Sequence, residues 1–308
     1  MNSEEELILN PEPIDIPPPA LRSLHSLIES VANFAQLRHE CAAQGIKFGP
    51  VTPWKGVTEA WGGAIPQGLH TILGAPGAGK TAFALQLAAE CQCPCLFVTC
   101  EMTPEELVRR LAARFTRTTL KQFKDGSLSG DMVRKKVELT LEECPDLYIA
   151  NGMQEYISPE LIENFAEQIR KDNGHLLIVI DSVHSWVQSD TRPSSTTSEY
   201  DRLNAAVGQL LTIAANLKCP VIVITERNRS SFNKHASEEK LHAGAGSRKL
   251  EYSPESVLNL ELRKSDKVGD FDKDVTLTFE KNRNGGKGTP IELTFQGLYQ
   301  CFKENTRE

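Results

Sequence analysis

The sequence predicts an α/β protein with a mostly parallel, twisted sheet flanked by helices. Short apolar runs, of the kind found in strands buried on both faces, alternate along the chain with stretches of helical apolar spacing. After Ser256 the pattern changes to runs that are typical of antiparallel strands, separated by turns rich in Gly, Asp and Asn. We therefore expect a parallel sheet followed, at the carboxyl end of the chain, by antiparallel strands.

The expected elements follow one another in a regular order. Parallel strands are expected at Leu69–Gly74, Cys95–Glu101, Leu147–Asn151, Leu176–Asp181 and Pro220–Thr225. The helices between them are expected at Lys80–Cys91, Thr103–Phe115, Pro159–Asp172 and Glu199–Leu217. The segment "TPEE", Thr103 to Glu106, has the pattern of a capping box with proline at the first helical position. The antiparallel strands are expected in "SVLNLEL", "DVTLTFEK" and "PIELTF".

The first fifty residues differ in character from the rest. Residues 1–19 are acidic and rich in proline, a composition that cannot pack a core, and we expect them to be disordered. From Ala20 to about Gly45 apolar residues recur every three or four positions, which predicts one amphipathic helix. Its apolar face needs a partner, either on its own domain or on a neighbouring subunit. The expected division is a disordered tail at 1–19, a linker-type helix at 20–50 and one domain at 51–308.

Composition and charge exclude several classes of protein. With 308 residues and 40 % hydrophobic content the chain can bury a full core. Its net charge of −7 argues against a broadly basic surface, so any nucleic-acid contact has to come from a local strip or an oligomeric channel. The chain holds no apolar run long enough to span a membrane, and its N-terminus "MNSEEE" is acidic where a secretory signal is basic. We therefore expect a cytoplasmic protein with no membrane contact.

The cysteines leave two interpretations open. Eight cysteines are too few for a disulfide scaffold in a chain of this length, and Cys91, Cys93, Cys95 and Cys100 crowd into "CQCPCLFVTC". A zinc site is the first interpretation, although paired C-x-x-C knuckles and a nearby histidine are missing. Small buried thiols beside a central strand are the second.

The segment "GAPGAGKT", Gly74 to Thr81, matches G-x-x-x-x-G-K-[ST] between an expected strand and an expected helix. Its glycines let backbone N–H groups face a phosphate, Lys80 neutralises the β- and γ-phosphates, and the Thr81 hydroxyl binds Mg²⁺. A chance glycine-rich turn is the alternative, which the agreement of pattern and context disfavours. We expect ATP and Mg²⁺ as ligands, with nucleotide contacts from Gly74, Ala75, Pro76, Gly77, Ala78, Gly79, Lys80, Thr81 and Ala82.

Two carboxylates follow apolar runs and are expected at one edge of the sheet. Asp181 ends "HLLIVID" and has the Walker B pattern of an acid that orients Mg²⁺, and Glu101 ends "CLFVTCE". Because the carboxyl ends of parallel strands open on the same edge, both acids gather near the P-loop. There Glu101 can polarise the water that attacks the γ-phosphate. The alternative for Glu101 is a first-turn acid of the next helix, a position that Glu105 and Glu106 already fill.

The order of the motifs resembles one known family. The strand tip "TCEM", the P-loop preceded by "GGAIPQGLHTILG", the Walker B "VIDS", the strand and turn "VIVITERNRS" and the late "KNRNGGKG" together resemble the RecA-like ATPase core of DnaB-type replicative helicases. The resemblance runs from about Thr52 to Phe295. It implies a RecA-like sheet, ATP hydrolysis, and a hexameric ring that translocates on single-stranded DNA.

The resemblance also implies roles for individual residues. Glu101 corresponds to the catalytic base and Asp181 to the magnesium-binding acid. Lys281 and Arg283, in "KNRNG", correspond to a pair that reaches the γ-phosphate of the neighbouring subunit, where a planar guanidinium stabilises the transferring phosphoryl group. A charged hairpin turn is the alternative interpretation of this segment.

Two polar segments, Gln188–Tyr200 and Asn228–Ser253, stand where the family binds DNA. Composition alone describes them equally well as polar surface loops, and the resemblance favours DNA contact. The basic residues expected to contact DNA in the second segment are Arg229, Lys234, Arg248 and Lys249.

Two features depart from the family. Glu226 stands where the family carries a glutamine that senses the γ-phosphate, and an anion there is unfavourable unless a cation pairs with it. Either Arg227 or Arg229 compensates, or the sensing works differently. The family's separate primase-binding domain has no counterpart in residues 1–50, which are expected to supply only the linker-type helix.

Two functions remain open. The first is a ring-forming, ATP-hydrolysing motor that translocates on or unwinds DNA in replication or mobile-element maintenance, with a protein of those processes as a further partner. The second is a regulatory or scaffolding ATPase of the KaiC or RadA kind, whose ATP-dependent ring binds protein partners without unwinding. The motifs "TCEM" and "NRS" favour the first function, whereas Glu226, the acidic net charge and the expected lack of a primase-binding domain favour the second.

Overall fold

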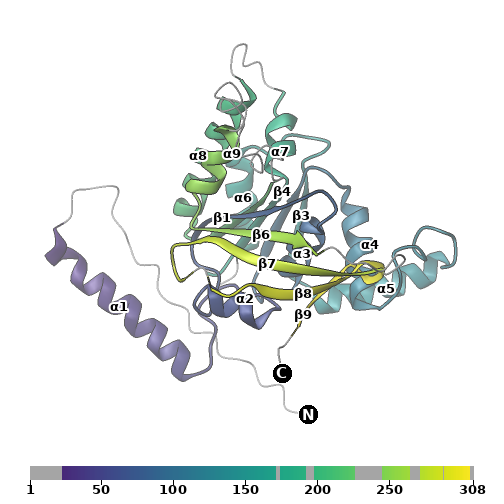
Figure 1. Ribbon diagram of the computed structural model, residues 1–308, viewed down its shortest axis with the longest axis horizontal. Coiled ribbons are helices and arrows are strands. Elements are labelled where there is room, and N and C mark those ends of the chain that lie inside the picture. Colours follow the sequence, from purple (N-terminus) through teal and green to yellow (C-terminus); the bar gives the residue numbers. More distant parts are fainter. Residues whose placement is uncertain are drawn as a thin grey trace.

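The computed structural model describes residues 23–170, 174–191, 198–225, 245–263, 271–286 and 288–305, except for the side chains of residues 245–248. Within these ranges a nine-stranded sheet of order β3-β2-β4-β5-β1-β6-β7-β8-β9 runs through the molecule (Figure 1). In chain order its strands are β1 (Gly68–Gly74), β2 (Cys95–Thr99), β3 (Leu147–Asn151), β4 (Leu177–Asp181), β5 (Pro220–Ile224), β6 (Ser256–Leu262), β7 (Asp272–Asn282), β8 (Ile291–Gln296) and β9 (Cys301–Glu304).

The sheet combines a parallel and an antiparallel part. Strands β1 to β6 pair in parallel, with β1 between β5 and β6, and β2 between β3 and β4. Strand β7 then pairs antiparallel with β6, and β8 and β9 continue outward in the same manner. This topology confirms the predicted fold class, a mostly parallel sheet with antiparallel strands at its carboxyl end.

Helices cover both faces of the parallel part. The helices of the described chain are α1 (Leu24–Ala43), α2 (Lys55–Ala60), α3 (Lys80–Ala89), α4 (Pro104–Phe115), α5 (Gly130–Glu143), α6 (Pro159–Ile169), α7 (Val183–Ser189), α8 (Glu199–Asn216), α9 (Ala245–Tyr252) and the 3₁₀ turn η3 (Gly297–Tyr299). Successive residues of a strand point to opposite faces. Leu177 and Val179 of β4 therefore pack with α2, α3 and α4, whereas Ile178 and Ile180 pack with α6, α7 and α8.

Several predicted boundaries are wrong by one to three residues, and one burial prediction fails. Strand β2 ends at Thr99 rather than Glu101, because the Thr99 hydroxyl binds the backbone of Met102 and turns the chain. One half of the predicted capping box of α4 is confirmed, since the Thr103 side chain accepts a hydrogen bond from the Glu106 N–H, whereas the Glu106 carboxylate binds Arg109 and Lys124. Strand β3 is not buried on both faces: it forms the edge of the sheet, and Tyr148 is 41 % exposed.

Some elements have no counterpart in the sequence prediction. Helix α5 escapes detection because its apolar residues do not form one buried stripe, and Met132, Leu139 and Leu141 are all exposed. The short helices α2, α7 and α9 span too few turns to show a period. Strand β9 lies in a tail that the pattern leaves unassigned; its Phe302 packs edge-on against Phe83 of α3, with ring centroids 5.5 Å apart.

Helix α1 lies within the expected linker segment 20–50 and projects from the body of the molecule (Figure 1). Its carboxyl half touches the domain, where Phe34 packs against Phe48 and Arg38 donates a hydrogen bond to the Gly62 carbonyl. Its amino half exposes Leu24, Ile28 and Val31 to solvent. The expected tail at 1–19 lies outside the described residues, and the division at residue 50 stays a prediction. None of the described helices combines the length and apolarity needed to cross a membrane.

The crowded cysteines lie beside the start of β2. Cys91, Cys93 and Cys95 are buried, and the Sγ atoms of Cys91 and Cys93 are 3.7 Å apart. Within the described ranges no group of three potential metal ligands from Cys, His, Asp or Glu is present. The positions of these side chains are those of small residues that fill the core.

Candidate active site

The P-loop connects β1 to α3 and turns sharply to do so. Gly77 and Gly79 both have left-handed backbone angles, with φ of 79° and 85°. A Cβ atom at Gly79 would lie 2.9 Å from the ring of Phe302, so the loop requires glycine there for space as well as for φ. The Lys80 Nζ donates to the carbonyl groups of Gly74 and Ala75, at 2.9 and 3.2 Å, and so lies back along the loop.

A cavity of about 350 Å³ opens at this loop, on the carboxyl edge of the parallel strands. Among its lining residues are Lys80 and Thr81 from the start of α3, Glu101 from the turn after β2 and Asp181 from the end of β4. The expected nucleotide contacts all line the cavity except Gly74, Ala75 and Ala78. The sequence-based grouping of the P-loop with the two carboxylates therefore corresponds to one physical cavity.

Asp181 is the buried acid of this cavity. It is only 1 % exposed, and neither carboxylate oxygen accepts a hydrogen bond of normal geometry, although the Thr81 hydroxyl lies close enough to influence its titration. Burial raises the pKa of Asp181 to about 6, with the Glu101 charge acting in the same direction and Thr81 and Lys80 opposing it. A buried carboxylate with unfilled acceptor positions is a group that a cation stabilises.

Glu101 lies beside Asp181 but faces solvent. Asp181 is the last residue of β4 and Glu101 follows the adjacent strand β2, and the Cys100 N–H donates to the Asp181 carbonyl at 2.7 Å, which ties the two strand ends together. Hydroxyls of Ser182 and Ser185 both donate to Glu101 Oε1 and fix the direction of the carboxylate. Helix α4 begins only at Pro104, so Glu101 lies outside its first turn. The geometry thus gives no support to the interpretation of Glu101 as a first-turn acid.

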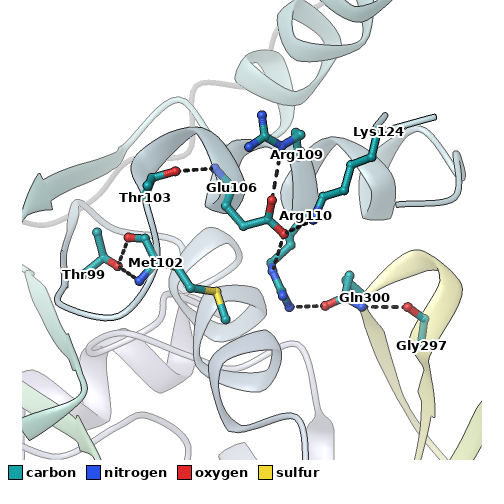
Figure 2. A network of polar contacts seen from close by, with 9 residues as sticks. All are labelled: Thr99, Met102, Thr103, Glu106, Arg109, Arg110, Lys124, Gly297 and Gln300. Carbon is teal, nitrogen blue, oxygen red and sulfur yellow. Dashed lines mark hydrogen bonds and ion pairs between the residues drawn. The ribbon is translucent and has the colours of Figure 1, made fainter. Parts of the chain in front are cut away.

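A network on α4 adds a cation to the cavity (Figure 2). Arg110 lines the cavity, and its Nη1 donates to Gln300 Oε1 at 2.5 Å. Gln300 in turn donates to the Gly297 carbonyl at 2.7 Å, and Glu106 lies 3.5 Å from the Arg110 Nε. Glu106 also pairs with Arg109 and Lys124, so its charge is shared among three cations. The network thus holds the side chain of Arg110, on α4, against the turn before β9.

Arg110, Gln300 and the two serines that orient Glu101 are not among the site residues predicted from the sequence. Helical spacing offered a sign for Arg110, because it stands four residues after Glu106 on the same face of α4. No pattern could reveal Gln300, which is 190 positions from its partner Arg110. Ser182 and Ser185 follow the Walker B acid directly, and only the fold brings them to the carboxylate of Glu101.

The expected trans pair lies far from this cavity. Lys281 lies opposite Val257, and Asn282, the last residue of β7, pairs with Ser256 at the start of β6, so Arg283 follows at the amino edge of the parallel strands. Ser256 lies beside His70 of β1, so roughly four residues, or about 13 Å at 3.3 Å per residue, separate this level from Gly74 at the carboxyl end of β1. Neither Lys281 nor Arg283 lines the P-loop cavity of its own chain.

The remaining expected site residues are only partly described. The Lys249 Nζ donates to the Asn204 carbonyl of α8 at 2.8 Å, which anchors α9 on α8. Glu226, Arg229 and Lys234 lie outside the described residues, as does the side chain of Arg248. Thr225, directly before Glu226, lines the cavity and shares a hydrogen bond with His184 of α7 at 2.9 Å.

Comparison with known proteins gives consistent relatives. "Replicative DNA helicase DnaB" of Buchnera aphidicola subsp. Baizongia pistaciae is 24 % identical over 274 residues, which cover 82 % of this chain and 57 % of that protein. "Probable replicative DNA helicase" of Trieres chinensis is 26 % identical over 243 residues, covering 76 % and 52 %. The chain thus spans about half the length of these curated relatives.

Solved structures share the fold. The structure of an isolated ATPase domain matches with a TM-score of 0.71 at 19 % identity, covering 90 % of this chain and 98 % of that one. A structure of a DnaB-like replicative helicase and its interactions with primase matches with a TM-score of 0.68 at 17 % identity, covering 92 % and 67 %. These matches confirm the RecA-like fold class.

The family model of the DnaB-like helicase C terminal domain matches residues 50–304, from the segment before α2 to the end of β9. That range contains the P-loop, both carboxylates, the α4 network and the antiparallel strands. With the motifs in their expected order and the fold in agreement, the chain belongs to the DnaB-like helicase C-terminal domain family.

Proposed function

We propose that this protein is an ATP-hydrolysing, ring-forming motor that translocates on or unwinds DNA in the cytoplasm, in replication or mobile-element maintenance. The observation that carries the proposal is the single cavity that gathers Lys80, Glu101 and Asp181 at the carboxyl edge of the parallel strands. A phosphate cradle, a solvent-facing carboxylate and a buried carboxylate are the groups that hydrolysis of a nucleoside triphosphate needs. Family membership adds the expectation that DNA is what the motor acts on.

The residues of the cavity fit a magnesium ion. Asp181 offers two buried oxygens without hydrogen bonds of normal geometry, and Thr81 offers a hydroxyl close by. These two residues would hold Mg²⁺, which neutralises phosphate charge when bound. Lys80 adds a second positive charge at the P-loop, and Arg110 of α4, which also lines the cavity, adds a third. The chain itself thus supplies cations around the expected position of the triphosphate.

Glu101 is assigned the role of the base. A carboxylate that accepts a proton from attacking water has to be accessible to water and fixed in direction. Glu101 meets both conditions, because it is exposed while two serine hydroxyls hold its Oε1. Asp181, by contrast, is buried and suited to hold a cation. The two acids therefore take different roles because their surroundings differ.

The trans pair and α1 support the ring. Neither Lys281 nor Arg283 lines the cavity of its own chain, and both are held at the amino edge of the parallel strands, so we assign them to the triphosphate of a neighbouring subunit. Helix α1 exposes a stripe of Leu24, Ile28 and Val31 that its own domain leaves uncovered, and a neighbouring subunit is the expected partner. Six copies around single-stranded DNA would multiply the weak contacts of each subunit.

Replacing Glu101 with glutamine tests the assignment of the base. The change keeps the size of the side chain and its acceptor for the serines but removes the proton acceptor. We expect the steady-state kcat for ATP to fall by about 10²- to 10⁴-fold, while the Kd for a fluorescent ATP analogue stays unchanged. Glu105→Gln, at an exposed acid in the first turn of α4, is the matched control. An unchanged kcat in Glu101→Gln would remove Glu101 from the mechanism.

Replacing Asp181 with asparagine tests the buried acid through pH. The pKa is raised from 3.8 to about 6, so the folded protein binds the proton more tightly than the unfolded chain does. The free energy of unfolding therefore falls as pH rises from about 4 to 6, and above pH 6 the whole destabilisation caused by the buried charge of Asp181 remains. Without nucleotide, Asp181→Asn should raise the free energy of unfolding by about 2–3 kcal/mol at pH 8 and by less at pH 5.

Chemical denaturation at both pH values, with and without magnesium and ATP, measures this effect. In the wild type we expect magnesium and ATP to raise stability at pH 8, and in Asp181→Asn to raise it much less. Asp274→Asn, at an exposed acid of β7, is the control for the loss of a negative charge. A gain in Asp181→Asn that is equal at pH 5 and pH 8 would contradict the raised pKa.

Charge on the apolar stripe of α1 tests the subunit contact. We expect Val31→Asp to shift the assembled protein toward smaller species in light scattering after size-exclusion chromatography, because an aspartate in an apolar interface is costly to bury. Asn33→Asp adds the same charge on the opposite side of the helix and should leave the assembly intact. Equal behaviour of the two variants would show that another surface holds the subunits together.

Hydrolysis with and without a single-stranded oligonucleotide tests the DNA motor. We expect the oligonucleotide to stimulate hydrolysis, and we expect the stimulation to weaken as salt rises, because phosphate contacts release counterions. Duplex DNA of the same length is the control. Hydrolysis that is lost in Glu101→Gln yet indifferent to DNA would favour the regulatory or scaffolding ATPase instead.

A further inference from the structure

A short turn between α9 and β6 holds both members of the expected trans pair. The Lys281 Nζ donates to the carbonyl groups of Tyr252 and Pro254. The Arg283 Nη1 donates to Glu255 Oε1 at 2.9 Å, and its Nη2 lies 3.4 Å from the Tyr252 carbonyl. Residues 252–255 therefore contact both cations, and Glu255 contributes the anion of this turn.

Glu255 is itself fixed from three sides. Its N–H donates to the Leu69 carbonyl of β1 at 2.7 Å, and its carbonyl accepts from the Arg283 N–H at 2.9 Å. Its side chain lies against Gly68, where a Cβ atom would come within 2.6 Å of the Glu255 Cγ. Gly68 also has a φ of 118°, a conformation that favours glycine. The backbone and the carboxylate of Glu255 thus both hold Arg283.

Charge explains why this position carries an acid. Lys281 and Arg283 lie two residues apart at a strand end, and they repel each other; burial and the Arg283 charge together lower the pKa of Lys281. Glu255 offsets that repulsion at the guanidinium, while neutral carbonyls hold the ammonium. The contact is open to solvent, with side-chain exposures of 52 % for Arg283 and 28 % for Glu255, so an incoming phosphate can compete with it.

Both cations keep donors for a ligand. An ammonium has three N–H groups, of which two reach the carbonyls of the turn, and a guanidinium has five, of which only some face Glu255 and Tyr252. A long arginine side chain would otherwise sample many rotamers before it met a phosphate. The ion pair with Glu255 restricts the rotamers of Arg283 while it leaves some of the guanidinium N–H groups available to a ligand.

We propose that Glu255 is a positioning residue for the trans pair, which holds Arg283 extended beside Lys281 so that the triphosphate of a neighbouring subunit meets a preformed cationic fork. The inference rests on the proposed trans role of Lys281 and Arg283 and adds to it the residue that sets their geometry. Glu255 does not touch the phosphate itself. It acts through Arg283 and lowers the cost of ordering that side chain in the transition state.

Kinetics of the whole protein give the first test. We expect Glu255→Gln to lower kcat by about tenfold and Glu255→Ala by up to about a hundredfold, because glutamine keeps an acceptor for Arg283 and alanine keeps none. The Kd for nucleotide should stay unchanged, since the cavity of the same chain is untouched. Glu59→Gln, an exposed acid of α2, is the control for surface charge. An unchanged kcat in both Glu255 variants overturns the proposal.

Mixed rings give the second test and distinguish a failure of the positioning role of Glu255 from a failure of the trans role of Lys281 and Arg283. A Lys80→Ala subunit has a defective nucleotide site but an intact trans pair, whereas an Arg283→Ala subunit has the reverse. The two variants are co-expressed with different tags, and rings that carry both tags are purified. We expect these mixed rings to hydrolyse ATP faster than the mean of the rings made from each variant alone, because some interfaces combine the two intact halves. Glu255→Ala should show the same gain when it is combined with Lys80→Ala.

The outcomes of the mixing experiment distinguish the positioning role of Glu255 from the trans role of the two cations. A gain with both Arg283→Ala and Glu255→Ala supports the positioning role of Glu255. A gain with Arg283→Ala alone overturns that role and leaves the trans pair in place. The absence of a gain with either variant overturns the trans role itself, and the inference about Glu255 fails with it.

Discussion

The buried amide of Gln86 is the contact on which much of the structure depends. Its Nε2 donates to the Phe302 carbonyl at 3.0 Å and its Oε1 accepts from the Phe302 N–H at 2.7 Å, so one side chain of α3 fixes the register of β9. An amide buried in a core is costly unless both ends are satisfied, which leaves few alternatives to this pairing. The ring of Phe302 then fills the space beside Gly79, and the turn before β9 carries Gln300 to Arg110. The last strand of the chain thus shapes the wall of a cavity that begins at the P-loop.

The two edges of the parallel strands carry different halves of the proposed chemistry. The carboxyl edge holds the phosphate loop, the buried Asp181 and the solvent-facing Glu101, because β1, β2 and β4 all end there. The amino edge holds Lys281 and Arg283, because the antiparallel β7 returns to it. In the proposed mechanism, a subunit built in this way would carry the nucleotide and the cations that act on its neighbour's nucleotide at opposite edges. Such an arrangement suits a ring in which every interface joins one edge to the other.

Local sequence information predicts the parts of this protein whose cause is local. Continuous apolar runs indicate strands inside the sheet, and the P-loop pattern indicates its own strand, turn and helix, so the fold class and the group Lys80, Glu101 and Asp181 could be anticipated. Edge position is not a local property: the sequence of β3 resembles that of its neighbours, yet no further strand pairs with its outer side in the described chain. The sequence pattern also does not predict helix α5, since this helix exposes the apolar residues that would normally mark a buried stripe.

The sequence by itself determined the nucleotide loop, the acids at the strand ends and the change from parallel to antiparallel strands, because each depends on residues close together in the chain. Only the tertiary structure decided which acid is buried and which faces solvent, since the surroundings of Asp181 and Glu101 come from several elements. The same holds for Arg110 with Gln300 and for Arg283 with Glu255, whose partners lie 190 and 28 positions away. Contacts of that range are set by strand order and register, which only the folded sheet defines.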